Sequence, residues 1–184
     1  MKISFSKLLA FICFSFIFIV NAGDLSAQDN KTIIFVCTGN TCRSPMAEGI
    51  AKEIVTEKKL PYTIISRATK IDPKEVVANP KSVEVMKKQG IDISTHKSLM
   101  INEEDIKNAT SILTMTESHK EGLLKLFPNA KDYTFTITEY ATGKAGNISD
   151  PWGKEIDEYE KTAAQLNTLV PQAIDKFATE ENKK

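Results

Sequence analysis

A run of apolar residues that stops at a cysteine constrains this chain more than any other feature. Residues 33–36 (Ile-Ile-Phe-Val) have the β-branched and aromatic composition of a buried strand, and Cys37 follows them directly. Residues 38–42 (Thr-Gly-Asn-Thr-Cys) have the composition of a tight loop. After Arg43 comes a Ser-Pro pair, in which we expect Ser44 to be the N-cap of a helix and Pro45 its first residue. The stretch therefore predicts a strand, a short loop and a helix.

The same loop has the features of an anion-binding site. Gly39 and Asn40 tolerate the positive φ angles that turn successive backbone N–H groups into one hollow. The N-terminus of the following helix directs its dipole into that hollow, and Arg43 stands across the loop, separated from Cys37 by five residues. All three features favour a thiolate over a thiol at Cys37. The pattern places a nucleophile where a phosphate group would bind.

The motif Cys37-x5-Arg43-Ser44-Pro45, with Asp150-Pro151 far downstream, resembles the low-molecular-weight protein phosphatase family. That family contains tyrosine phosphatases and the bacterial protein-arginine phosphatases. The resemblance extends from about Thr32 to the C-terminal helix. It implies an enzyme that hydrolyses phosphorylated protein side chains through a phosphocysteine intermediate, with no metal and no cofactor.

Three residues are the candidates for catalysis. Cys37 is the nucleophile that attacks phosphorus in line. Arg43 has a planar guanidinium group that can hold two phosphate oxygens at once. It is one of only two arginines among the 24 basic residues, which indicates that lysine is used at positions where only a positive charge is needed. Asp150 is the general acid for the leaving group and then the general base for water.

The resemblance also assigns residues that bind the substrate and residues that support the loop. The binding residues are Thr38, Gly39, Asn40, Thr41, Cys42 and Trp152, and the supporting residues are Ser44, Ser66 and His96. Trp152 either walls the cleft or is a partly buried structural tryptophan. Arg67 replaces a small residue of the family and its role stays open, whereas His119 belongs to no motif and is expected on the surface or at a helix end.

The loop residue Thr41 bears on the substrate. Tyrosine-type members of the family usually carry a bulky apolar residue there, and arginine-type members carry threonine, whose hydroxyl can help to position the attacking water. The amino-acid sequences of residues 35–48 and 135–143 also resemble the arginine-type members most. Phosphoarginine is therefore the favoured substrate, with phosphotyrosine as the alternative.

Two other classes of protein share the loop and stay open. A thiol-based arsenate reductase needs further cysteines downstream to relay electrons, and this chain has none after Cys42. A non-catalytic binder of phosphorylated ligands would be held inert by a Cys37–Cys42 disulfide. In the resembling family the second cysteine bonds reversibly to the nucleophile and protects it from overoxidation.

The N-terminus predicts export. Lys2 and Lys7 precede an apolar run over 8–20, followed by small residues, which is the layout of a secretory signal peptide. We expect residues 1–22 to be removed, with cleavage after 27 and an uncleaved anchor as the two alternatives. The mature protein is then periplasmic or secreted by a bacterium, without stable membrane association. An oxidising compartment there could hold the Cys37–Cys42 pair as a disulfide.

The rest of the chain predicts one α/β domain over 31–178, followed by a charged tail at 179–184. We expect a four-stranded parallel sheet with helices on both faces and the phosphate-binding loop after the first strand. The 24 basic and 24 acidic residues leave no excess positive charge for nucleic acid, and the oligomeric state is open. The later strands are expected at 62–66, 111–115 and 133–137, and the helices at 45–59, 82–89, 103–108, from Thr116, and at 156–178.

Overall fold

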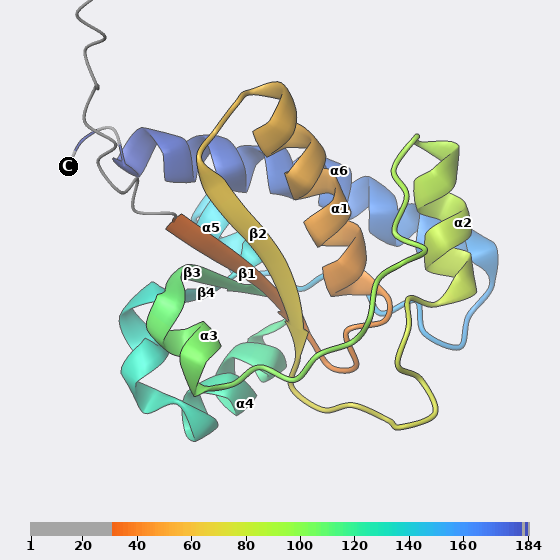
Figure 1. Cartoon of the computed structure of the whole chain (residues 1–184), viewed down its shortest axis with the longest axis horizontal. Coiled ribbons are helices and arrows are strands. Elements are labelled where there is room, and N and C mark those ends of the chain that lie inside the picture. Colours follow the sequence, from red (N-terminus) through yellow and green to blue (C-terminus); the bar gives the residue numbers. More distant parts are fainter. Residues whose placement is uncertain (1–30, 182, 184) are drawn as a thin grey trace, which may run out of the picture.

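The computed structural model describes residues 31–181 and 183, which form a parallel sheet between two layers of helices (Figure 1). The strand order is β2-β1-β3-β4, so the predicted fold class is confirmed. The strands are β1 (Lys31–Cys37), β2 (Tyr62–Ala68), β3 (Ala109–Thr114) and β4 (Thr134–Thr136). The helices are α1 (Arg43–Glu57), α2 (Pro80–Lys88), α3 (Glu103–Asn108), α4 (Glu117–Leu126), the 3-10 helix η1 (Pro128–Tyr133), α5 (Ile137–Thr142) and α6 (Ile156–Glu181).

Strand β1 is central because both of its faces are buried. Ile33 and Phe35 pack with Cys37 in the larger core, against residues of α1 and α6, whereas Ile34 and Val36 belong to a second core with residues of α3 and α4. Burial on both faces explains the uninterrupted apolar run of β1. With a parallel partner on each side, the strand fixes the position of Cys37 at its carboxyl end.

The long helix α6 closes the larger core. It lies across α1 in Figure 1 and buries Tyr159, Ala163 and Leu166, among others, against that core. The helix runs to Glu181, so the first residues of the predicted charged tail continue it. Two contacts hold this end: Tyr140 donates to the Glu180 carboxylate at 2.8 Å, and Glu181 forms an ion pair with Lys31.

The fourth strand is shorter than expected, and a short helix takes its place from Ile137 onward. The prediction of a strand through Ile137 is wrong because a capping box starts a helix there. The Thr136 hydroxyl accepts from the Glu139 backbone N–H, and the Glu139 carboxylate accepts from the Thr136 N–H. Gly143 ends α5 in the left-handed conformation, with φ of 71°.

The predicted signal peptide at 1–22, its later cleavage limit at 27 and the alternative of an uncleaved anchor lie outside the described residues. Within 31–181, no helix is both long enough and apolar enough to cross a membrane.

Helix α1 approaches the segment after α2 through Gly49. A Cβ atom at Gly49 would lie 2.9 Å from a methyl carbon of Ile91 and 2.9 Å from a methyl carbon of Ile93. Gly122 in α4 is a matched case, because a Cβ there would meet nothing within 4 Å. The lack of a side chain therefore allows close packing at Gly49 but is not needed for packing at Gly122.

The two glycines predict opposite effects of alanine. Gly122→Ala should stabilise the protein by up to about 1 kcal/mol, because alanine favours the helical backbone. Gly49→Ala should lose about 1–3 kcal/mol through overpacking against the two isoleucines. Urea unfolding followed by circular dichroism measures both free energies of unfolding. Equal stabilisation by the two substitutions would show that α1 does not pack as described.

Candidate active site

The loop between β1 and α1 is organised by Asn40, which lies buried in the left-handed region with φ of 55°. Gly39 has no positive φ, so the expected flexibility is used by Asn40 alone. The Asn40 side chain donates to the hydroxyls of Ser44 at 2.9 Å and Ser66 at 2.8 Å. Its backbone carbonyl accepts from Ser98 Oγ at 2.9 Å. These contacts compensate the cost of a left-handed conformation at a residue with a side chain.

His96 supports the same residue from outside the loop. Its Nε2 lies 2.9 Å from the Asn40 carbonyl oxygen, which can only accept, so Nε2 carries the proton and donates. Burial lowers the pKa of His96, and the Glu48 carboxylate near its other ring nitrogen opposes that shift. The neutral imidazole therefore serves as a fixed hydrogen-bond donor to the loop.

Ser44 connects this network to the nucleophile. Its hydroxyl accepts from Asn40, which leaves its own proton free to be donated to Cys37 Sγ, 3.0 Å away. The prediction that Ser44 is the N-cap of the helix is wrong: α1 begins at Arg43, and Cys42 occupies the N-cap without a side-chain cap. The hydroxyl stabilises negative charge on sulfur instead of capping the helix.

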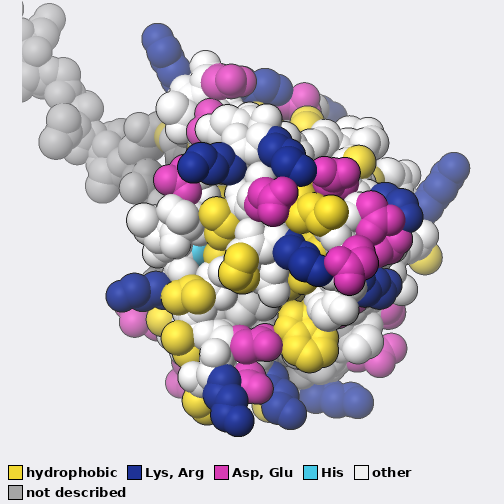
Figure 2. Space-filling view, turned by 90° about the vertical axis from the view of Figure 1, so that its right-hand side faces the viewer, with side chains coloured by type: hydrophobic (Ala, Val, Ile, Leu, Met, Phe, Trp, Pro, Cys, Tyr) yellow, Lys and Arg dark blue, Asp and Glu magenta, His cyan; other side chains and the backbone are white. Residues whose placement is uncertain are grey.

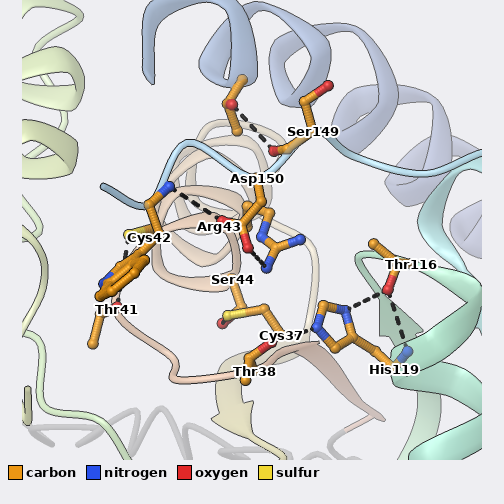
Figure 3. A network of polar contacts seen from close by, with 12 residues as sticks. Cys37, Thr38, Thr41, Cys42, Arg43, Ser44, Thr116, His119, Ser149 and Asp150 are labelled. Atoms are coloured by element: carbon orange, nitrogen blue, oxygen red, sulfur yellow. Dashed lines mark hydrogen bonds and ion pairs between the residues drawn. The ribbon is translucent and has the colours of Figure 1, made fainter. Parts of the chain in front are cut away.

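Arg43 and Asp150 face each other across the site (Figure 3). Arg43 Nη2 lies 2.6 Å from Asp150 Oδ2, and the arginine side chain is only 6% exposed, whereas that of the aspartate is 52% exposed. Among the described residues, no partner accepts a hydrogen bond from the buried Arg43 Nε. A buried donor without a partner is costly, so an anion that reaches both nitrogens would be stabilised.

Arg43 and Asp150 line a cavity of about 320 Å³ together with Cys37 and most of the other predicted site residues. Asn40, which was predicted to bind the substrate, does not line the cavity, and neither do the supporting residues Ser44, Ser66 and His96. Trp152 lines the cavity and is 56% exposed, so its side chain is at once partly buried and part of the cavity wall. Lys70, Asp72 and Glu75 also line the cavity. The full lining is Cys37, Thr38, Gly39, Thr41, Cys42, Arg43, Lys70, Asp72, Glu75, Asp150 and Trp152.

Arg67 does not reach the cavity. Its Nε donates to Asp105 Oδ2 at 2.8 Å, and its Nη1 donates to the Ser66 carbonyl at 2.9 Å. The structure thus answers the question that the sequence left open, because this arginine ties β2 to α3 instead of contacting a phosphate.

His119 is a site residue that the sequence analysis missed. It lies in the first turn of α4, buried rather than on the surface, and Nε2 is 2.8 Å from Thr38 Oγ1 (Figure 3). The Thr116 hydroxyl accepts from the His119 backbone N–H and lies 2.9 Å from Nδ1. Thr116 can thus donate to Nδ1, and Nε2–H to Thr38. The Thr-x-x-His spacing at a helix start was the available pattern.

A cysteine at the carboxyl end of a central parallel strand, an anion-binding loop and an arginine on the next helix define the cysteine-dependent phosphatase class of site. The family model described as low molecular weight phosphotyrosine protein phosphatase matches residues 32–183. The chain belongs to this family, which confirms the resemblance seen in the sequence.

Individual relatives carry different names. A protein-arginine-phosphatase of Geobacillus stearothermophilus is 38% identical over 81% of this chain and 97% of its own. The low molecular weight protein-tyrosine-phosphatase PtpB of Staphylococcus haemolyticus is 41% identical over 75% and 94%. An arsenate reductase of Staphylococcus aureus is 35% identical over 82% and 98%.

A solved structure also matches. It is a mutant of the YwlE arginine phosphatase whose active-site serine is phosphorylated, with a TM-score of 0.78 and 35% identity over 83% of this chain and 99% of that chain. Its phosphorylated residue is the active-site serine that the mutation introduced, so the phosphoryl group is carried by the active-site side chain in that protein.

The environment of His119 predicts a dependence of stability on pH. Burial, and secondarily the Arg43 charge, lowers the pKa of His119 from 6.5 to about 4, while Asp150 opposes the shift. Between these two values the unfolded state binds more protons than the folded state. The contribution of His119 to the free energy of unfolding is therefore fully present above pH 6.5 and is lost as the pH falls towards 4.

Replacing the imidazole tests this assignment. His119→Gln keeps a donor for Thr38 and removes the titrating group, so its loss of stability between pH 7 and pH 5 should be smaller than that of the unmodified protein. One proton accounts for at most about 1.4 kcal/mol per pH unit. Urea unfolding at a series of pH values gives both curves. Parallel curves would mean that His119 is not a buried neutral imidazole.

Proposed function

We propose that this chain is a protein phosphatase that removes phosphoryl groups from arginine side chains through a phosphocysteine intermediate. The observation that carries the proposal is the convergence on one cavity of Cys37 Sγ, the Arg43 donors and the Asp150 carboxylate. The loop amides and Arg43 neutralise the phosphate oxygens, which otherwise repel a nucleophile.

The reaction has two steps. The Cys37 thiolate attacks phosphorus, the bond between phosphorus and the guanidino nitrogen breaks, and protonated Asp150 gives its proton to that nitrogen. Water then attacks the phosphocysteine, its proton goes to Asp150, and the bond between phosphorus and sulfur breaks to release phosphate and the thiolate. The Ser44 hydroxyl, 3.0 Å from Sγ, stabilises the thiolate both before the reaction and as the leaving group.

The Arg43–Asp150 ion pair places the carboxyl group beside the phosphate-binding arginine. In the structure Asp150 Oδ2 lies 2.6 Å from Arg43 Nη2. A bound phosphate takes over the Arg43 donors, because phosphate oxygens accept from a guanidinium as a carboxylate does. Substrate binding thereby releases the Asp150 carboxyl group to reach the leaving nitrogen.

Thr41 supports phosphoarginine as the substrate. Its side chain lines the cavity and is small and polar, so it leaves room for a water molecule and offers a hydroxyl to position it. The relative named protein-arginine-phosphatase and the matching arginine phosphatase structure also support this choice. Phosphotyrosine remains the second candidate, which the 41% identical PtpB relative supports.

The other two classes are less well supported. Arsenate reduction consumes reducing equivalents from further thiols, and the sequence has no cysteine after Cys42. A binder inactivated by a disulfide is disfavoured because Cys37 and Cys42 are both free thiols in the structure.

Export and redox protection are also part of the proposal. Burial raises the pKa of the Cys42 thiol, so this cysteine stays protonated while Cys37 faces the Ser44 donor. We expect Cys42 to form a reversible disulfide with Cys37 under oxidation. Intact-mass analysis of protein isolated from the medium or periplasm reads the mature N-terminus and the thiol state together. A full-length chain, or thiols that resist mild peroxide, would contradict these two parts.

Changing Thr41 tests the choice of substrate. Thr41→Ile should lower kcat/KM for a phosphoarginine peptide and spare or raise kcat/KM for a phosphotyrosine peptide, because it removes the hydroxyl and crowds the water. One hydroxyl contact in a buried site changes the ratio of the two constants by roughly tenfold. Thr41→Ser, which keeps the hydroxyl, is the matched control. Preference of the unmodified protein for phosphotyrosine, with an unchanged ratio in Thr41→Ile, would overturn phosphoarginine as the substrate.

A further inference from the structure

The mouth of the catalytic cavity is spanned by a hydrogen bond between two separate loops. The indole Nε1 of Trp152 donates to Glu75 Oε2 at 2.9 Å. Trp152 follows the catalytic Asp150, whereas Glu75 lies between β2 and α2, and both side chains line the cavity. Cys37 and Arg43 in the floor are buried, so the exposed Trp152 belongs to the rim, where a leaving group would depart.

The loop that carries Glu75 is fastened to the phosphate-binding loop. At one end, the backbone N–H of Lys70 donates to the Thr38 carbonyl at 3.0 Å. At the other end, the Asn79 N–H donates to the Thr41 carbonyl at 2.8 Å. Between them, the Glu75 N–H donates to the Asp72 carbonyl at 2.9 Å and closes a turn. The position of Glu75 is therefore set by the same backbone that binds the phosphate.

Glu75 gives the mouth a local negative charge. Within the described residues, no lysine, arginine or histidine forms an ion pair with it, whereas Asp150 is neutralised by Arg43. Lys70 and Asp72 contribute one charge of each sign to the lining. On the face drawn in Figure 2, acidic and basic side chains are interspersed without a broad patch of one sign, so the local charge dominates.

We propose that Glu75 is a specificity-determining residue that favours substrates whose leaving group carries a positive charge. It does so in two ways: its carboxylate attracts the cation, and its hydrogen bond holds the Trp152 ring as a wall on which a cation can stack. The inference rests on phosphate hydrolysis at Cys37 and deepens the proposed function, because the guanidinium of phosphoarginine carries such a charge.

Glutamine separates the two contributions. Glu75→Gln removes the charge but keeps an oxygen that accepts from the indole N–H, whereas Glu75→Ala removes both. Glu121→Gln, which changes an exposed glutamate of α4 outside the cavity, is the control for a general change in surface charge. Trp152 is the only tryptophan of the chain, so intrinsic fluorescence reports directly on the wall.

Two aryl phosphates test the charge independently of phosphoarginine. We use 4-(aminomethyl)phenyl phosphate, which is a cation at its far end, and 4-methylphenyl phosphate, which is not. In Glu75→Gln the ratio of kcat/KM for the cationic to the neutral compound should fall roughly fivefold, as for other rim charges. At 1 M salt this ratio should differ less between Glu75→Gln and the unmodified protein, because salt screens the charge of Glu75. The tryptophan emission should stay unchanged in Glu75→Gln and shift in Glu75→Ala.

The outcomes distinguish the inference from the proposed function. An unchanged ratio in Glu75→Gln, an equal loss on both compounds, or the same fall in Glu121→Gln would overturn the role of Glu75. Failure of the unmodified protein to hydrolyse a phosphoarginine peptide would overturn the proposed substrate while leaving the aryl phosphate test of Glu75 intact.

Discussion

The site depends on one backbone constraint, the left-handed conformation of Asn40. Ser44, Ser66 and Ser98, together with His96, hydrogen-bond to this residue and hold a conformation that a side chain normally disfavours. In return, Asn40 directs the Ser44 hydroxyl to Cys37. The residues that stabilise the turn are therefore the residues that stabilise the thiolate, which explains why the loop is supported from β2 and from the segment before α3 as well as from its own ends.

A second constraint couples the loop to the far end of the chain. The Arg43–Asp150 ion pair joins the start of α1 to the loop before α6, and Trp152 joins that loop to Glu75. The cavity is thus closed by segments that are more than 70 residues apart in sequence but meet at the carboxyl edge of one sheet. The ion pair at the floor and the hydrogen bond at the rim are therefore both made by one short segment, through Asp150 and Trp152.

The sequence pattern predicted the part of the site that is formed by residues adjacent in the chain. The run that forms β1, the loop after it and Arg43 are adjacent in the chain, so composition and spacing suffice to predict them. His119 contacts Thr38, and Glu75 lines the cavity, only because tertiary packing brings them there. At Ser44 the local sequence and the tertiary structure favour different roles. The Ser-Pro pair favours a helix cap, but the Ser44 hydroxyl instead hydrogen-bonds to Cys37. The helix at 137–142 was missed although its capping pattern was present.

The central claim is that the phosphoryl group passes through the Cys37 sulfur. The most direct measurement is peptide mapping by mass spectrometry of Asp150→Ala protein, quenched during turnover of 4-nitrophenyl phosphate. This leaving group needs no proton, and the variant lacks the base for the second step, so a phosphoryl group should accumulate on Cys37. Release of phosphate with no phosphorylated Cys37 peptide, or a phosphoryl group on another residue, would contradict the account.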